Sequence, residues 1–292
     1  MAGQLVKELI DAGIHFGHRA SRWNPKMKPY IFGKRNLIHI INIKETLKGL
    51  LLARKFVANT VAGGKDVLIV GTKRQARKSV EENAKRVGMH YVNDRWLGGT
   101  LTNFREIRKR VGRLDQLEQL EAQGLLDQYS KKEGSTLRRE KRKIERNLGG
   151  IRKMDKFPGV LVVIDQRREI IAVKEARKMG IPVVCLLDTD CDPDLVDIPI
   201  PGNDDGMRGI ELVVREMCDA AAEGLRLRTE GGPGAAGEEG GMPHRRISRR
   251  MTTTRAVEEA AVAAEKPAAV EAAPAPAAAD PAAPSAPEAP QV

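Results

Sequence analysis

Cysteines, aromatic residues and long apolar runs are all scarce in this sequence of 292 residues. The three cysteines, Cys185, Cys191 and Cys218, form no CxxC pair and have no neighbouring histidine. This pattern argues against a disulfide framework and against a structural zinc site built on thiolates. No run of 18 apolar residues occurs, so we expect no membrane-spanning helix. The first residues mix acidic and basic side chains without the apolar region of a secretion signal, which favours a cytoplasmic protein.

Positive charge is what the sequence has in excess. It contains 50 Lys and Arg against 39 Asp and Glu, and residues 1–230 hold 44 against 31. Such an excess does not specify a fold, but it favours a polyanionic partner or an anionic surface.

Short apolar runs alternate with amphipathic segments along most of the chain. The runs typical of buried strands are 66–72, 159–165, 181–188 and 197–200. Helical periodicity is found in 74–87, 167–179 and 207–223. Strands that are apolar on both faces and separated by helices are typical of a parallel sheet covered on both sides. We therefore expect an α/β core with a doubly wound parallel sheet, formed by residues 1–104 and 154–226.

Residues 105–153 interrupt this alternation. They contain no strand-like run and carry 15 basic and 8 acidic residues. Two segments each show one narrow apolar stripe at helical spacing: Ile107, Val111, Leu114, Leu117 and Leu120 in the first, and Leu137, Ile144, Leu148 and Ile151 in the second. We expect a coiled-coil hairpin whose turn is bracketed by Gly124 and Gly134. Two helices of roughly 20 residues would reach on the order of 30 Å from the sheet.

The C-terminal segment, residues 227–292, has the composition of a disordered tail. Residues 231–241 are rich in glycine, and 24 of the 42 residues in 251–292 are Ala or Pro. Such a segment buries too little apolar surface to offset its chain entropy. The basic cluster 244–250 is either a solvated patch or a mobile contact to phosphate or another partner.

The densest candidate site is the N-terminal segment 15–36, which combines many cations with four of the chain's ten aromatic residues. Glycines and prolines at 17, 25, 29 and 33 predict an irregular surface loop. Cations neutralise phosphates, and aromatic and guanidinium planes stack on exposed bases, so the segment indicates RNA binding. The alternative is that the aromatic residues fill the core. The candidate RNA contacts here are Arg19, Arg22, Trp23, Lys26, Lys28, Tyr30, Lys34 and Arg35.

Three further segments add candidate RNA contacts: residues 71–74, the turn-rich segment 94–104 and the start of the predicted arm. Residues 71–74 follow a predicted strand and precede a helix, where doubly wound proteins hold nucleotide phosphates. No glycine-rich nucleotide motif is present, so we expect these residues to contact RNA phosphate instead. The additional candidates are Lys73, Arg74, Arg95, Asn103, Arg108, Lys109 and Arg110.

Carboxylates at the ends of predicted strands raise the alternative of a magnesium-dependent phosphohydrolase. Asp188 and Asp190 nearly match the DxDx[TV] signature of haloacid-dehalogenase-like phosphatases, but Asp192 stands where Thr or Val is needed. We therefore expect no catalysis. His15 and His18 have no third metal ligand nearby in the sequence, so we expect them to be structural.

Several long motifs together resemble the bacterial small-subunit ribosomal protein two family. They include HFGH, WNPKMKPYIFG, VGTKR, RWLGGTLTNF and DTDCDPD, and they run in order from about residue 5 to 225. The resemblance implies a flavodoxin-like sheet with a protruding coiled-coil hairpin. It further implies a non-enzymatic protein of the cytoplasmic ribosome, bound to small-subunit rRNA near the head–body junction.

The same resemblance implies further partners and a ligand set. Other small-subunit proteins would be partners, including the messenger-capturing first one, whereas a membrane or a small-molecule substrate would not. It implies no cofactor, or at most a structural divalent cation, Mg²⁺ or Zn²⁺, held by Asp188, Asp204 and Asp205.

Overall fold

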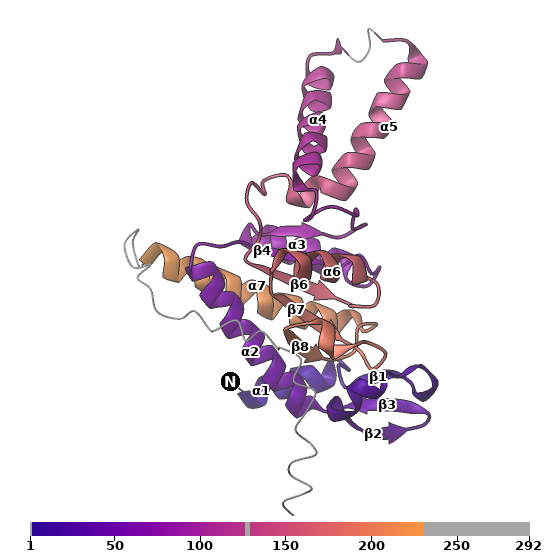
Figure 1. Ribbon diagram of the computed structural model, residues 1–292, viewed down its shortest axis with the longest axis vertical. Coiled ribbons are helices and arrows are strands. Elements are labelled where there is room, and N and C mark those ends of the chain that lie inside the picture. The colour runs from indigo at the N-terminus through magenta and orange to yellow at the C-terminus, as the bar shows by residue number, and fades with distance from the viewer. Residues whose placement is uncertain (1, 126–128, 231–292) are drawn as a thin grey trace, which may run out of the picture. The chain divides into compact units, whose positions relative to one another are not determined.

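The fold is built on a five-stranded parallel sheet (Figure 1). The computed structural model describes residues 2–125 and 129–230. The strand order is β5 (His90–Val92), β4 (Val67–Val70), β6 (Val160–Ile164), β7 (Val183–Leu187) and β8 (Ile198–Pro201). In chain order this is 2-1-3-4-5, the flavodoxin-like arrangement. The predicted α/β fold with a doubly wound parallel sheet is confirmed.

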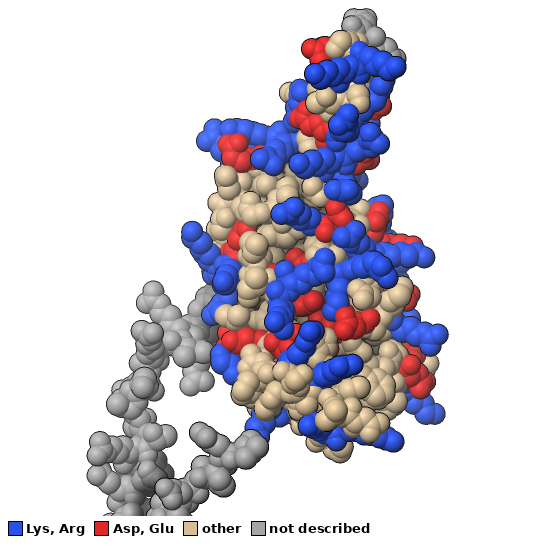
Figure 2. Space-filling view, turned by 90° about the vertical axis from the view of Figure 1, so that its right-hand side faces the viewer, with Lys and Arg blue, Asp and Glu red and all other residues tan. Residues whose placement is uncertain are grey.

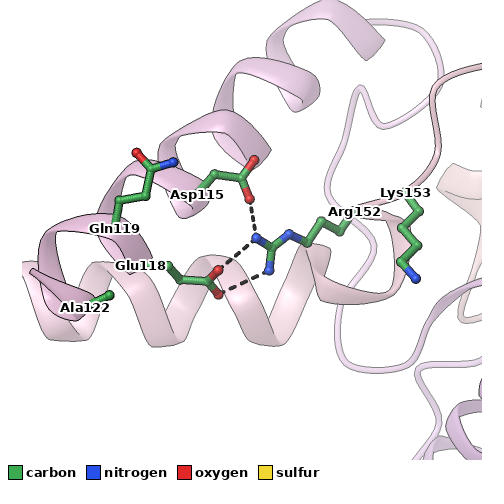
Figure 3. A pocket seen from close by; sticks show the side chains of 6 residues that line it. All are labelled: Asp115, Glu118, Gln119, Ala122, Arg152 and Lys153. Atoms are coloured by element: carbon green, nitrogen blue, oxygen red, sulfur yellow. Dashed lines mark hydrogen bonds and ion pairs between the residues drawn. The ribbon is translucent and has the colours of Figure 1, made fainter.

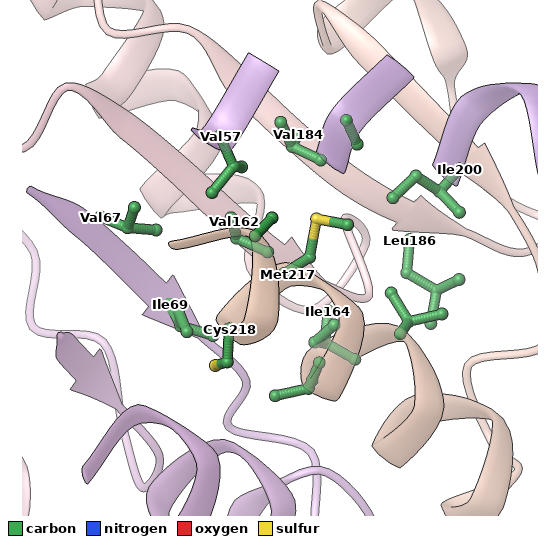
Figure 4. Packing of buried hydrophobic residues seen from close by; sticks show 14 of the residues in the cluster. Val57, Val67, Ile69, Val162, Ile164, Val184, Leu186, Ile200, Met217 and Cys218 are labelled. Atoms are coloured by element: carbon green, nitrogen blue, oxygen red, sulfur yellow. The ribbon is translucent and has the colours of Figure 1, made fainter. Parts of the chain in front are cut away.

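Side chains of the central strands alternate between two apolar layers, as the period of two in a strand requires. The first layer holds Ile69, Val162 and Val184 and is covered by α2 (Ile43–Ala62), α3 (Arg77–Val87) and α7 (Met207–Glu230). Figure 4 shows Met217 and Cys218 of α7 packed against these strand residues. This face of the sheet is thus buried from solvent, as the continuous apolar strands predicted.

The second layer is covered by a mixture of elements. Leu68, Val163 and Cys185 face α6 (Ile170–Met179) and the segment that contains Trp96 and Leu101. The base of the hairpin also contributes to this layer, through Ile107, Val111, Leu148 and Ile151. The predicted arm, 105–153, therefore shares its first turns with the core, and its boundaries stay a prediction.

The hairpin consists of α4 (Phe104–Ala122) and α5 (Lys131–Leu148). The stripe on α4 is buried as expected at Leu114 and Leu117, whereas Leu137 and Ile144 on α5 are only half buried. Gly134 does not bracket the turn as expected but is buried within α5. The reason is a capping box: Ser130 caps the helix and bonds reciprocally with Glu133, which starts the helix before the glycine. Coiled-coil packing of the two helices stays a prediction.

Segment 15–36 was expected to be an irregular loop, and this prediction of its backbone conformation is wrong. Residues 16–41 form a three-stranded antiparallel sheet, ordered β1 (Phe16–Arg19), β3 (Ile38–Ile41) and β2 (Ile31–Arg35). The prolines fall in a 3₁₀ helix, Pro25–Tyr30, between strands rather than inside them. The turn between β2 and β3 uses left-handed conformations at Asn36 and Leu37, which match the twist of a hairpin.

The remaining elements include three that were not predicted: α1 (Ala2–Asp11), α2 and the short strand β5. Helices α3 and α6 begin about three residues later than expected, because the chain first turns across the carboxyl edge of the sheet. Helix α7 continues to Glu230, so the tail predicted from residue 227 is helical over its first four residues. The rest of that predicted tail, including 244–250, lies outside the described residues. Within the described ranges, no helix is long and apolar enough to cross a membrane.

Candidate nucleic-acid interface and metal site

The three-stranded sheet carries the first of two cationic surfaces. Within the part of the chain that the structure describes, five exposed cations here have no carboxylate within ion-pair distance: Arg19, Arg22, Lys28, Lys34 and Arg35. Trp23 is partly exposed, with its ring 5.3 Å from that of His39. Tyr30 instead packs against the second apolar layer, as the alternative interpretation of the aromatic residues proposed. We refer to these five cations and Trp23 as the small-sheet surface.

The second group of exposed polar and cationic residues comes from the segment after β4, the segment before the hairpin and the start of α4. Arg74, Arg95, Asn103 and Arg110 are exposed, and the three arginines have no carboxylate partner among the described residues. We refer to these four residues as the arm-base surface. Figure 2 shows Lys and Arg spread over one face of the molecule from the hairpin downward, with Asp and Glu between them.

Four of the predicted RNA contacts already form ion pairs with carboxylates: Arg108, Lys109, Lys26 and Lys73. Lys109 pairs with Glu106 at 2.6 Å, and Arg108 Nη2 lies 2.5 Å from Asp155 Oδ1 while its Nη1 bonds to the Arg152 carbonyl. Arg108 therefore anchors the hairpin.

Lys26 and Lys73 differ in how firmly they are held. Lys26 Nζ lies 2.8 Å from both Asp192 and Asp194, and these hydrogen bonds raise its pKa, but the side chain is 49% exposed. A phosphate can replace such a surface ion pair. Lys73 is 12% exposed, and its ammonium is held by three carboxylates, including Asp204 at 2.8 Å. The structure thus places Lys73 inward, so this lysine does not belong to the proposed RNA surface.

Glu175, a residue that the sequence did not single out, organises the segment before the hairpin. Its buried carboxylate accepts hydrogen bonds from the backbone N–H groups of Gly99 (2.8 Å), Leu101 (3.0 Å) and Thr102 (3.2 Å). The Trp96 indole and the Thr102 hydroxyl also donate to it. Burial alone would raise the pKa of Glu175, but these donors outweigh it and hold the pKa below its ordinary value. The segment that carries Arg95 and Asn103 is therefore folded around one anion.

Ion pairs at the hairpin base fix α4 and α5 to the core. Arg152 contacts Asp115 at 2.5 Å and Glu118 at 2.8 Å on α4 (Figure 3). Arg146 of α5 contacts Asp94 at 2.8 Å, which also contacts Arg77 of α3. In Figure 3, Lys153 points away from this cluster and has no ion-pair partner within the described ranges.

A separate cluster of His18, Asp188 and Asp204 lies at the carboxyl edge of the sheet. One ligand atom from each of the three lies within 4.8 Å of the others. His18 Nδ1 is 3.2 Å from Asp188 Oδ2, a buried oxygen that meets the criteria for a hydrogen bond with none of the described residues. Asp205 borders this cluster: its carboxylate lies 4.0 Å from His18 Nδ1, but it is 55% exposed and contacts Lys73 at 2.7 Å.

The charges in this cluster perturb one another. The Asp188 carboxylate beside the ring raises the pKa of His18 to about 9. Burial, with the nearby charges of Asp165 and Asp188, raises the pKa of Asp204 to about 7. An excess of buried carboxylate and an orphaned oxygen fit a bound divalent cation. Histidine nitrogen together with carboxylate oxygens suits Zn²⁺, whereas Mg²⁺ prefers an all-oxygen set.

His18 was expected to be structural, and the structure shows why sequence reasoning missed it. Its partners Asp188 and Asp204 follow β7 and β8, 170 and 186 residues further along the chain. Residue spacing carries no sign of this cluster, and only the fold brings it together. His15 is not part of this cluster, and its ring lies against that of Phe16, with the centroids 4.1 Å apart and the planes tilted by 37°.

The edge where flavodoxin-like proteins bind phosphate is filled by this chain's own side chains. The backbone N–H and hydroxyl of Thr72 both donate to the carboxylate of Glu169, which is 3% exposed. Arg168 donates to the Thr72 hydroxyl at 3.0 Å. Asp190, in the near-match to the phosphatase signature, pairs with Arg167 at 2.7 Å. The arrangement leaves an internal carboxylate where a nucleotide phosphate would sit.

Comparison with known proteins agrees with this geometry. The model of the family described as ribosomal protein S2 matches residues 9–224. The chain belongs to this family. Small ribosomal subunit protein uS2 of Rhodopirellula baltica is 55% identical over 236 residues, covering 80% of this chain and 91% of that protein. The Thermobifida fusca protein of the same name is 50% identical over 276 residues, covering 93% and 94%. The family is structural and non-enzymatic, so the phosphohydrolase alternative is wrong.

Proposed function

We propose that this chain, a structural constituent of the small ribosomal subunit, binds small-subunit rRNA near the head–body junction. Small-subunit proteins of this kind act within the ribosome of the cytoplasm. The observation that supports rRNA binding is the set of exposed cations without carboxylate partners, within the described residues, on the small-sheet and arm-base surfaces. Cations held on a rigid sheet contact phosphates without first breaking internal ion pairs.

The binding free energy on this proposal comes largely from counterion release, so affinity falls steeply with salt. The test replaces Arg22, Lys28 and Arg35 by glutamine and measures rRNA affinity against salt concentration. Each lost phosphate contact is expected to reduce the slope of log affinity against log salt by about 0.7–0.9. A control with the same loss of charge replaces Lys55, Lys65 and Lys178, exposed lysines outside both surfaces. Equal effects of the two triple variants would contradict a specific surface.

We also propose that the apolar part of the small sheet supports docking of the messenger-capturing first small-subunit protein. Phe32 is 78% exposed and Leu37 70%, and Phe16 is also exposed. Side chains of this kind, grouped on one small sheet, are typical of a protein-binding surface. Phe32→Ser with Leu37→Ser is expected to abolish docking to purified small subunits while rRNA affinity stays unchanged. Loss of both activities would show that the variant disturbs the sheet itself.

We further propose that His18, Asp188 and Asp204 hold a structural Zn²⁺. The orphaned Asp188 oxygen and the mixed nitrogen and oxygen ligand set support this assignment. A bound cation would neutralise the buried carboxylates and link β1 to the ends of β7 and β8. Isothermal titration calorimetry of Zn²⁺ into the protein tests this assignment, with Mg²⁺ as the comparison cation.

A further inference from the structure

A pocket of about 250 Å³ lies at the base of the hairpin, between α4, α5 and the segment before α4. Leu97 comes from that segment, Arg110 and Arg113 from α4, and Lys143, Ile144 and Asn147 from α5. The pocket is distinct from the groove around Arg152 and from the cluster at the sheet edge. It directly adjoins the arm-base surface, because Arg110 belongs to both.

The pocket has an apolar wall and a cationic rim. Leu97 and Ile144 are half buried and form part of the wall. Arg113 is partly neutralised by Glu140, whose carboxylate lies 3.5 Å from its guanidinium. Arg110 and Lys143 have no carboxylate partner in the described parts of the chain. The rim is therefore left with uncompensated positive charge, which favours an anionic occupant with an apolar portion.

Asn147 supplies the polar group of the pocket. It is 9% exposed, and its side-chain oxygen is buried without a hydrogen-bond partner. An acceptor in this state destabilises a fold, and an apolar side chain of similar size would be the more stable choice. Among the described residues, no N–H or O–H group donates a hydrogen bond to this oxygen.

We propose that this pocket binds one unstacked nucleobase of the RNA, held between the apolar wall and Asn147, with Arg110 and Lys143 contacting its flanking phosphates. A base has flat apolar faces and a polar edge, and proteins recognise RNA mainly through such splayed bases. The volume is below the about 300–1,000 Å³ of pockets for drug-sized ligands, so it suits one base without its sugar and phosphates. Because the Asn147 side-chain oxygen lacks a donor partner among the described residues, a base that presents an N–H group to it is preferred.

This inference rests on the proposed rRNA binding and adds a base-specific contact to it. The decisive variant is Asn147→Leu in the full-length chain. If the amide serves only RNA, the variant melts at the same or a higher temperature yet binds small-subunit rRNA about tenfold more weakly. Its salt slope stays unchanged because no cation is lost, whereas Arg110→Gln lowers the slope by about 0.7–0.9. Gln119→Leu, outside the pocket on α4, is the matched control and should alter neither quantity.

Chemical probing identifies the occupant. Wild-type protein is expected to protect one unpaired base of the rRNA from chemical modification, and Asn147→Leu to lose that protection. Ile144→Phe, which fills the pocket from the other side, should give the same result and serves if Asn147→Leu folds poorly.

Wild-type RNA affinity in both pocket variants would overturn the pocket proposal while leaving the proposed function intact. Absence of RNA binding by the wild-type chain overturns both. Loss of docking of another protein with unchanged RNA affinity would assign the pocket to a protein side chain and overturn the inference.

Discussion

Replacement of Glu175 by glutamine tests whether one buried carboxylate folds the segment before the hairpin. In the wild type, one carboxylate oxygen accepts from Gly99 and the Trp96 indole, and the other accepts from Leu101 and twice from Thr102. Glutamine keeps one acceptor oxygen and turns the other into an NH₂ group. At best, therefore, two donors are left facing another donor.

The expected loss follows from these contacts. The loss of two hydrogen bonds costs about 1–1.5 kcal/mol each, and the remaining three donors bond more weakly to a neutral acceptor. Together these effects lower the free energy of unfolding by about 3 kcal/mol. For a folded unit of this size, about 3 kcal/mol lowers the melting temperature by roughly 6–12 °C. Thermal unfolding by circular dichroism measures it, and Lys174→Gln, an exposed neighbour on α6, is the control. A melting temperature within about 1 °C of wild type would refute the role of Glu175.

The same carboxylate predicts a pH dependence. Because the pKa of Glu175 is lowered in the folded state, its contribution is complete above the unfolded pKa of about 4.3 and is lost as pH falls through the folded pKa. The difference in unfolding free energy between wild type and Glu175→Gln should therefore be constant near neutral pH and shrink below about pH 4. Urea unfolding at several pH values measures it, and a constant difference into acid would contradict the assignment.

Three further predictions concern the hairpin, its base and the metal site. A Cβ at Gly150 would overlap the carbonyl oxygen of Tyr91, so Gly150→Ala should lower the unfolding free energy by about 2 kcal/mol, whereas Gly98→Ala, with no atom within 4 Å of its Cβ, should change little. Leu114→Ala should cost about 2–5 kcal/mol, measured by urea unfolding, because the side chain is 1% exposed. Zn²⁺ should raise the melting temperature of the wild type but not that of His18→Ala, and equal rises would place the cation elsewhere.

The parts of the fold that sequence predicts well are those where one local signal decides the structure. Val67–Val70 and Val160–Ile164 are short apolar runs between helical segments, and such runs have few other stable placements. The small sheet escaped prediction because Gly17 and Gly33 indicate a loop when considered locally. In the structure, Gly17 permits a close approach, since a Cβ there would lie 2.6 Å from Thr189.

The candidate site was harder to predict because its key contacts have no local signal. Exposed arginines are visible in the sequence, but whether a cation is free or paired depends on the fold, as the inward position of Lys73 shows. Glu175 was missed because its partners are backbone N–H groups, which every residue type except proline supplies. Asn147 was missed because an asparagine in a charged helix carries no sign of burial until the helix is packed.

The filled sheet edge explains how this fold supports an assembly role without chemistry. In a flavodoxin-like sheet, the carboxyl edge offers N–H groups and a crevice to a phosphate. Here Glu169 accepts a hydrogen bond from the N–H of Thr72, and Asp204 accepts one from the ammonium of Lys73. The groups that would hold a ligand therefore stabilise the edge instead. On the proposed function, contacts with rRNA are therefore made by the small-sheet and arm-base surfaces. Mutations at the carboxyl edge should therefore lower the free energy of unfolding, and they should weaken RNA binding only where the protein unfolds. Mutations at Arg22 or Arg110 should weaken RNA binding and leave the free energy of unfolding nearly unchanged.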